Sequence, residues 1–284
     1  MTVGRRTSRR PVREGTEVTR ALNTLADRAP VVSLPVAEPA PKRVSSPFRN
    51  PIRAAAPAPI DVGTAVVAFS VSWIVAQLVS SLVVGAFSGG QPVSEVSIGV
   101  MAAALSAAWV CYLLGMWVAS DRAGTGNFVV DYGVTFRGVD AIGLGIGALS
   151  QLVVVNLVYL PLRSLWPDVF TDDRLQENAK DLIGRANGGS AILLVVLVGF
   201  GAPVAEELFY RGLLQRPLLA RYNDGLVVVG VAMLFALVHF RVVEYPGLFV
   251  FALILGFCAM RTGRLGMAIT THIGFNLTGL VLAW

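Results

Sequence analysis

Ionisable side chains are rare in the apolar C-terminal third of this 284-residue sequence, so each one there is a candidate for chemistry. The chain has only two histidines, His239 and His272, and both lie in apolar runs. Two adjacent glutamates, Glu206 and Glu207, precede them in another apolar run, and Asn276 follows His272 by four positions. Such groups are costly in hydrocarbon, so their presence indicates either a reactive site or pairs that hold helices together.

The spacing around the two glutamates gives them different partners. On a helix, Glu207 and Arg211 are four residues apart and share a face, so their charges can pair. Glu206 points about 100° away and must find its partner on another helix. An unpaired carboxylate in an apolar pocket is a candidate general base. We therefore expect Glu206 to react, and Glu207 with Arg211 to support it.

The histidines and Asn276 offer hydrogen-bonding groups for the same site. His272 and Asn276 are four residues apart, so the imidazole and the carboxamide project from one side of a helix and suit an oxyanion. His239 follows Phe235 by one turn. Taken alone, each histidine also fits a buried residue that donates to a backbone carbonyl.

Three chemistries fit this set of residues. First, Glu206, His239 and His272 are potential zinc ligands, although no His-Glu-x-x-His is present. Second, Glu206 with His239 can activate water without a metal, while His272 and Asn276 stabilise the oxyanion. Third, a Glu/His relay can move protons or ions in a transporter. A serine or cysteine triad fits less well, because no G-x-S-x-G occurs.

These residues must be positioned by membrane helices. The chain is 55% hydrophobic and only 14% charged, against roughly 25% charged in soluble domains, which excludes an ordinary soluble fold. Apolar runs that approach the length of a membrane span predict an all-α integral membrane protein with about seven transmembrane helices. The runs are 62–87, 97–119, 139–160, 190–208, 225–240, 245–260 and 265–284.

The basic charge is concentrated before these helices. Residues 1–60 carry a net charge of +7, whereas the remaining 224 residues carry −2. We interpret 1–60 as a disordered, Pro/Ala-rich cytoplasmic tail that suits an anionic leaflet, and we exclude a nucleic-acid partner. The Lys and Arg residues near the span ends place the N-terminus in the cytoplasm and Trp284 at the outer face of the cell membrane.

The remaining chain divides into three parts. Residues 61–162 form N-terminal transmembrane helices, 163–189 an external loop with a short interfacial helix after Asp172, and 190–284 the part that carries the candidate site. Gly143, Gly145 and Ala148 match the G-x-G-x-x-A dinucleotide-binding fingerprint, but no strand precedes them. Gly143 and Gly147 instead predict a close helix contact.

One geometrical conflict follows from these boundaries. If the fourth span is 190–208, Glu206 lies within about 8 Å of the inner face, whereas His239 lies about 20 Å above it. The helices must therefore tilt, break near Pro203, or have other boundaries.

The motifs resemble the CAAX prenyl protease and bacteriocin-immunity family of intramembrane proteases, the type II CAAX endopeptidase group. Its Glu-Glu-x-x-x-Arg motif is matched at 206–211 and its Phe-x-x-x-His motif at 235–239. Its third motif is matched by Gly256, Arg261-Thr262-Gly263, and His-x-x-x-Asn at 272–276. The similarity covers about 190–280.

The resemblance implies a four-helix catalytic core that cleaves peptide bonds near or within the bilayer. It implies that Glu206 activates water with help from His239, that His272 and Asn276 stabilise the oxyanion, and that Glu207 and Arg211 support them. No cofactor is favoured, with zinc as the alternative. The expected partners are a membrane-associated protein or peptide substrate and the lipid bilayer. The alternative function is a transporter, or an adaptor or immunity protein, that uses the Glu/His cluster for ion binding or helix packing.

Overall fold

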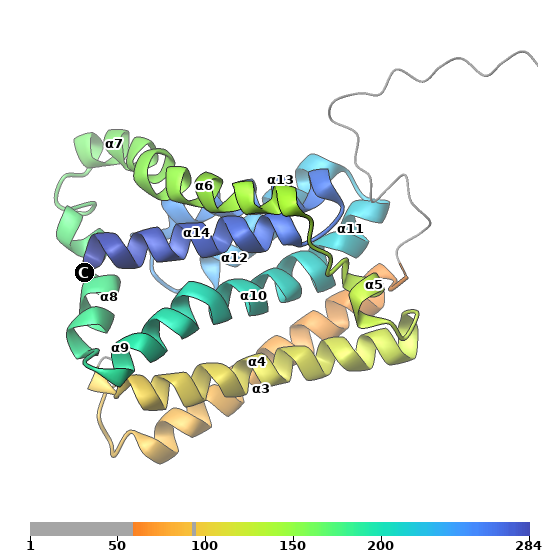
Figure 1. Ribbon diagram of the computed structural model, residues 1–284, viewed down its shortest axis with the longest axis horizontal. Helices are drawn as coiled ribbons and strands as arrows, with labels where there is room; N and C mark the ends of the chain where they lie inside the picture. Colours follow the sequence, from red (N-terminus) through yellow and green to blue (C-terminus); the bar gives the residue numbers. More distant parts are fainter. Residues whose placement is uncertain (1–58, 93–94) are drawn as a thin grey trace, which may run out of the picture. The chain divides into compact units, whose positions relative to one another are not determined.

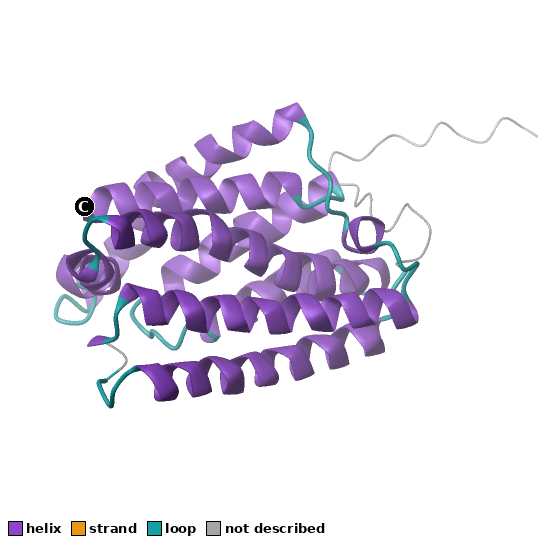
Figure 2. Ribbon diagram, turned by 60° about the horizontal axis from the view of Figure 1, so that its bottom comes forward, coloured by secondary structure: helices purple, strands orange, loops and turns teal. Residues whose placement is uncertain are grey.

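The computed structural model describes residues 59–92 and 95–284, and every regular element among them is a helix. The predicted tail, 1–60, lies almost entirely outside the described residues. Six helical segments are long and apolar enough to cross a membrane. The all-α, multi-span prediction is therefore confirmed (Figures 1 and 2).

Four of the six segments are single helices, and two are runs in which α-helical and other helical turns alternate. The single helices are α3 (Val62–Phe87), α4 (Ile98–Ala123), α13 (Tyr245–Thr262) and α14 (Gly266–Ala283). One run contains η2 (Gly138–Ala141), α6 (Ile142–Leu149), η3 (Ser150–Val154) and α7 (Val155–Leu165). The other run contains α9 (Gly189–Leu194), η4 (Val195–Gly201), α10 (Ala202–Glu206), η5 (Glu207–Gln215) and α11 (Arg216–Arg221).

Six long helices agree with the prediction of about seven spans, and one predicted run, 225–240, is shorter in the structure: it forms α12 (Asp224–Leu237), which has only 14 residues. At 1.5 Å per residue α12 measures about 21 Å, which is shorter than the roughly 30 Å hydrocarbon core. Its apolar sequence continues to Phe240, but the helix stops because residues 238–244 form a turn that leads into α13.

The fourth predicted span, 190–208, is also corrected, because the helical run continues to Arg221. Polar residues such as Arg211 and Gln215 suggest in the sequence that the chain leaves the membrane, yet both are buried with partners. Glu206 now lies 15 residues from the end of its run, and His239 lies 15 residues after the start of α12. Glu206 thus lies about 22 Å along its run, and His239 directly follows the end of α12, which is about 21 Å long, so the conflict in depth is removed.

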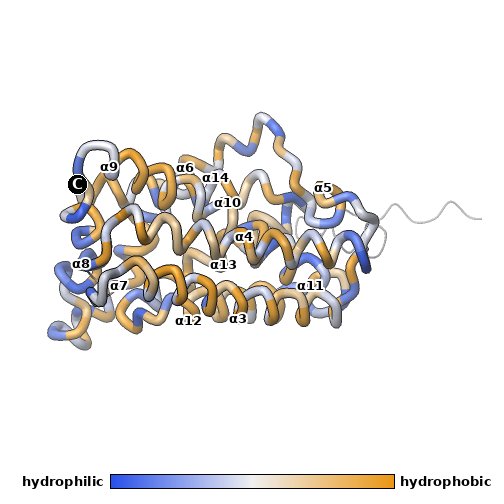
Figure 3. Tube along the Cα trace, turned by 90° about the horizontal axis from the view of Figure 1, so that it is seen from below, coloured by the Kyte–Doolittle hydropathy of each residue, from blue (hydrophilic) through white to orange (hydrophobic). Residues whose placement is uncertain are grey.

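The run 189–221 lies between the α3/α4 pair and the helices α14 and α6 (Figure 1). Loops and hydrophilic segments gather at the two ends of the helices, and the tubes between them are mainly apolar (Figures 2 and 3). We call one end the α8 end, after α8 (Asp172–Arg185), and the other the α5 end, after α5 (Phe128–Tyr132). Exposed apolar residues along α3, such as Val67 and Leu82, present a surface suited to lipid.

The predicted close contact of Gly143 and Gly147 is confirmed in the packing of α6 on α14. A Cβ atom at Gly147 would collide with the backbone around Thr271 and Phe275, and one at Gly274 would collide with Leu144. Small residues let two helix backbones approach, which is a common packing device in membranes. The α14 helix, which carries His272 and Asn276, is therefore held directly against α6.

The short helix predicted in the 163–189 connection is present as α8. Thr171 caps its N-terminus by accepting a hydrogen bond from the Arg174 N–H, and Asp172 and Asp173 occupy the first turn. Negative charge at this position favours the helix.

Candidate active site

The candidate site brings together three parts of the C-terminal region. Glu206 and Glu207 lie at the junction of α10 and η5, His239 follows the end of α12, and His272 and Asn276 lie on α14. The η5 segment has π-helical hydrogen bonding, which is rare and frequently occurs at functional sites.

Glu207 is the centre of a buried polar cluster. Its Oε1 atom accepts a hydrogen bond from Arg211 Nη1 at 3.0 Å and another from His272 Nδ1 at 2.9 Å. Both Glu207 and Arg211 are completely buried. Glu207 and Arg211 thus form the pair that their spacing predicts. The contact with His272, 65 positions away, was not anticipated from the sequence.

This contact fixes the orientation of the His272 ring. A carboxylate can only accept a hydrogen bond, so the proton must lie on Nδ1 of His272. The other ring nitrogen, Nε2, then faces Glu206, whose Oε2 lies 3.9 Å away. The Glu206 side chain is 24% exposed, in contrast to the closed environment of Glu207. The two adjacent glutamates therefore differ in access to water and lie on either side of one imidazole.

Phe235 connects the two histidines. Its ring centroid lies 4.9 Å from that of His239 and 5.9 Å from that of His272, and the Arg211 guanidinium carbon lies 4.7 Å from it. His239 Nδ1 donates to the Phe235 carbonyl at 2.7 Å, which leaves Nε2 as the unprotonated nitrogen of the neutral ring. This is the carbonyl contact of an ordinary buried histidine, and it also orients His239.

Phe240, which follows His239, has a left-handed backbone with φ of 53°. Such a conformation is uncommon for a bulky residue and stores strain. It is the one non-glycine residue with positive φ in the described chain, and it lies where α12 ends.

Asn276 has a backbone partner in the central run. Its Nδ2 donates to the Val198 carbonyl at 2.7 Å. In the π-helical pattern of η4, Val198 would receive the N–H of the residue five positions later, but that residue is Pro203, which has none. Asn276 thus satisfies a carbonyl that proline leaves free and keeps its second amide hydrogen and its carbonyl oxygen for other contacts.

The glycine of the third motif is explained by a second contact of η5. Gln215 Nε2 donates to the Gly256 carbonyl at 2.9 Å, and a Cβ atom at Gly256 would lie 2.8 Å from Gln215 Oε1. One turn earlier, Arg211 Nη2 donates to the Ala252 carbonyl at 3.2 Å. These two bonds hold α13 against η5.

Two tyrosines near Glu206 had no role in the sequence interpretation. Tyr112 of α4 and Tyr210 of η5 both interact electrostatically with Glu206. Tyr112 stacks on Phe209 with ring centroids 3.9 Å apart. Tyr210 is four residues after Glu206, which is a signal visible in the sequence, whereas only the tertiary structure brings Tyr112 close.

Zinc does not fit the arrangement of the three potential ligands. Within the described residues, no group of three His, Cys, Asp or Glu side chains is arranged to hold a metal ion, and this includes Glu206, His239 and His272. His272 Nδ1 is already engaged by Glu207. We therefore derive no chemical step through a metal.

These features define a helical membrane protein with a buried Glu–His–Arg cluster and a partly exposed glutamate beside it. Residues 188–278 match the model of the family described as type II CAAX prenyl endopeptidase Rce1-like. The match covers about a third of the chain and contains all three motifs, so the family resemblance is confirmed for this segment. The comparisons with curated proteins and with solved structures found no match.

Proposed function

We propose that the protein is an intramembrane endopeptidase that hydrolyses peptide bonds of membrane-associated proteins or peptides. The observation that carries this proposal is the placement of His272 between two glutamates of different access. Buried Glu207 fixes the ring, and partly exposed Glu206 faces the second ring nitrogen, Nε2, at 3.9 Å. The family match over 188–278 supports the same class of reaction.

In this mechanism Glu206 accepts a proton from water, and the oxygen of that water attacks the carbonyl carbon of the peptide bond. The carbonyl oxygen becomes an oxyanion, which the Asn276 amide and the His272 Nε2–H stabilise. His272 donates from Nε2 in its doubly protonated form, in which Nδ1 keeps its hydrogen bond to Glu207.

The tetrahedral intermediate then collapses. The C–N bond breaks, and the leaving nitrogen takes the proton held by Glu206, so a free carboxyl group and a free amine result. His239 lies against Phe235 beside this site and assists the transfer of the proton through its Nε2 atom.

Glu206→Gln tests the mechanism, because it keeps the shape of the side chain and removes the base. The purified protein in lipid vesicles is given a mixture of quenched fluorescent peptides, and hydrolysis is followed by fluorescence. We expect Glu206→Gln to abolish cleavage while the melting temperature stays that of the unmodified protein. Glu95→Gln, at an exposed loop position, is the matched control and should retain full activity.

The same assay tests the proposal that no metal is needed. Strong chelators should leave the rate unchanged, and the purified protein should contain no stoichiometric zinc. Loss of activity in chelator, with recovery on addition of zinc, would overturn this part of the mechanism. Full activity of Glu206→Gln would overturn the role of Glu206.

We also propose that the α5 end faces the cytoplasm. Arg122, Arg137, Arg216, Arg221, Arg261 and Arg264 lie toward that end, and the basic residues before α3 add to them. Arg163, Arg174, Lys180, Arg185 and Arg241 lie toward the α8 end. Lys and Arg near the span ends resist translocation, so the excess favours this orientation. Arg211 is left out of this comparison of the two ends, because it is buried inside the helical run.

A further inference from the structure

A cavity of about 320 Å³ lies among α7, α8, α13 and α14, toward the α8 end. Its wall includes Asn276 and its backbone partner Val198, so the cavity adjoins the candidate active site. Asp172 and Gln176, which also line it, are exposed, so the cavity reaches the surface beside α8. Its volume is within the range of ligand sites.

The polar wall of this cavity consists mainly of uncharged carboxamides. Five such side chains come from four elements: Gln151, Asn156, Gln176, Asn178 and Asn276.

The charged residues of the wall are already paired. Arg163 Nη2 lies 2.6 Å from Asp172 Oδ1, and Glu244 Oε1 accepts from Arg241 Nη1 at 3.4 Å. Two of the carboxamides already donate to backbone carbonyls, Asn156 to Leu152 and Asn276 to Val198, and apolar side chains form most of the remaining wall. The cavity therefore offers neutral donors and acceptors within an apolar surface, and little free charge.

A carboxamide carries a donor and an acceptor, as a peptide group does. An apolar ligand would leave these groups unpaired, and an ionic ligand would find no free counter-charge. An extended polypeptide segment needs such partners, because unwinding leaves its backbone N–H and C=O groups without hydrogen bonds. Unpaired backbone groups are costly beside a bilayer. The lining thus matches an extended peptide backbone.

We infer that this cavity binds the extended segment of the substrate on one side of the cleaved bond, and that the substrate enters from the α8 end. The inference rests on the proposed function and specifies its substrate class. With the α5 end in the cytoplasm, the substrate is a polypeptide whose unwound segment lies at the extracytoplasmic face. A prenylated C-terminus at the cytoplasmic face would approach from the opposite end.

The α8 helix forms the outer wall of the cavity. Leu175, Ala179 and Leu182 line the cavity and recur at helical spacing, so they form one face of α8. The C-terminal end of α8 is anchored because Arg185 Nη1 donates to the Val96 carbonyl at 3.0 Å. The wall is therefore attached to the loop before α4 as well as to the chain on either side.

Glu244 connects the cavity with His239. It lines the cavity and lies just before α13, outside the spanning helices. Burial raises the pKa of its carboxyl group, whereas Arg241 and His239 lower it. The cavity thus borders the proposed active site at Asn276, and Glu244 of its wall lies in the turn that follows His239.

Gly279 allows the cavity to be filled without changing a catalytic residue. It lines the cavity, and an added Cβ atom would meet only the Gln151 carboxamide, at 3.6 Å, which is an ordinary contact. Gly279→Ala should therefore be tolerated, whereas Gly279→Leu extends into the cavity. Gly230→Leu is the matched control, because a Cβ atom there meets nothing within 4 Å.

The first experiment measures hydrolysis of the quenched peptide mixture by these variants in lipid vesicles. We expect Gly279→Leu to lower kcat/KM by about tenfold or more, mainly through KM, with an unchanged melting temperature. Gly230→Leu should behave as the unmodified protein. Gly279→Ala, which adds a single methyl group to the cavity wall, should lower kcat/KM less than Gly279→Leu does. Undiminished kcat/KM in Gly279→Leu would overturn the inference.

The second experiment measures access from each side of the membrane. Asn178→Cys in the cavity and Gly138→Cys at the α5 end are labelled in intact cells with a membrane-impermeant maleimide, with the unmodified protein as the background. We expect label at position 178 in intact cells, label at 138 only after permeabilisation, and slower labelling at 178 when the peptide mixture is present. The reverse labelling, or no protection by peptides, would contradict the inference.

The outcomes separate the inference from the proposed function. If the unmodified protein cleaves no peptide in lipid vesicles, the proposed function fails, whereas protection of Asn178→Cys still reports on peptide binding. If cleavage occurs but Gly279→Leu and the labelling give the contrary results, only the cavity assignment and the direction of entry fail.

Discussion

Glu207 and Glu206 are neighbours in the sequence but have different surroundings. Glu207 is completely buried and accepts hydrogen bonds from Arg211 and His272 through one oxygen atom. Glu206 is partly exposed and faces His272 across 3.9 Å. Glu206 is thus available to water, whereas Glu207, which pairs with Arg211, holds the His272 imidazole in place.

Glu207→Gln should destabilise the protein. The change removes negative charge next to the buried Arg211 guanidinium, and breaking a buried ion pair typically costs about 3–5 kcal/mol. We expect a lower melting temperature in detergent or a lower amount of protein in the membrane. If Glu207→Gln instead resembles Glu206→Gln, with normal stability and no activity, the division between the two glutamates is wrong.

Asn276→Ala should lower the turnover rate by about 100-fold or more, as loss of an oxyanion donor does, with KM little changed. The variant also leaves the Val198 carbonyl without its side-chain partner, so the melting temperature must be measured alongside. Thr278→Ala, two positions further along α14, is the control. A lower melting temperature with an unchanged turnover rate would show that Asn276 is purely structural.

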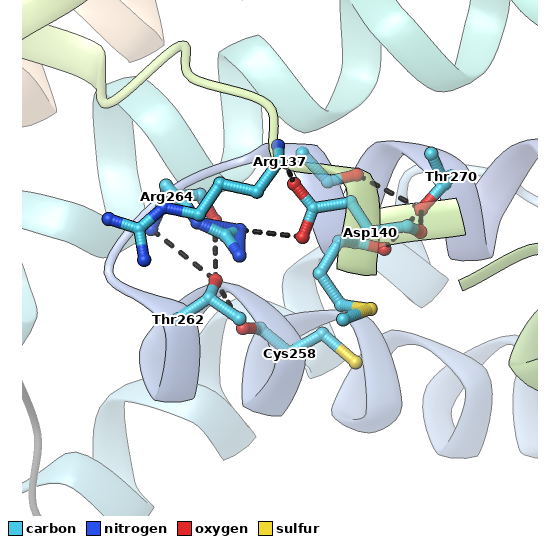
Figure 4. A network of polar contacts seen from close by, with 8 residues as sticks. Arg137, Asp140, Cys258, Thr262, Arg264 and Thr270 are labelled. Atoms are coloured by element: carbon cyan, nitrogen blue, oxygen red, sulfur yellow. Dashed lines mark hydrogen bonds and ion pairs between the residues drawn. The ribbon is translucent and has the colours of Figure 1, made fainter. Parts of the chain in front are cut away.

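At the scale of elements, α14 is positioned by residues outside the segment that matches the family. Asp140 Oδ1 accepts from Arg264 Nη1 at 2.6 Å, and the Asp140 carbonyl accepts from Thr270 Oγ1 at 2.5 Å. The Arg137 N–H also donates to Asp140 Oδ2 (Figure 4). This network joins η2, which leads into α6, to the first turns of α14. Thr270, which takes part in it, lies two residues before His272.

Breaking this network should destabilise the protein. Asp140→Asn leaves Arg264, which is nearly buried, without its carboxylate, and we expect a loss of about 3–5 kcal/mol. The single variants Asp140→Asn and Arg264→Met should each lower the melting temperature, and the double variant should lose less than their sum. Additive losses would show that the two residues do not act as a pair. Asp121→Asn, in an exposed pair, is the control.

For the whole molecule, the N-terminal basic region is expected to influence orientation in the membrane. The described helices begin at Val62, and deletion of residues 1–55 removes none of them. We expect the truncated protein to retain its helices and its hydrolysis of peptides, because the deletion removes charge rather than apolar core. A mixed orientation of the truncated protein, measured with the same maleimide assay, would agree with the charge argument.

Loss of all folded protein on this truncation would contradict the interpretation of residues 1–60 as a disordered tail. The first described helix, α3, has its own N-terminal cap. Asp61 caps α3 by accepting from the Thr64 N–H and hydroxyl, and these hydrogen bonds lower the pKa of its carboxyl group. The truncation leaves this cap intact.

Local spacing and hydropathy were sufficient for the features that depend on neighbours along one helix. They predicted the membrane helices, α8, the Glu207–Arg211 pair and the close packing of Gly143 and Gly147. Residues four apart on a helix lie side by side, and an apolar run of sufficient length suits hydrocarbon wherever it occurs. The motifs also indicated the family whose model matches 188–278.

Tertiary structure decided what depends on contacts between distant segments. Arg211 and Gln215 stay inside a continuous helix because Glu207, Ala252 and Gly256 satisfy their polar groups, which a hydropathy average cannot register. The bond between His272 and Glu207 joins positions 65 residues apart, and Asn276 finds a carbonyl that Pro203 leaves free. Sequence spacing specifies faces of single helices, whereas the partner of a buried polar group is known only when the helices are packed.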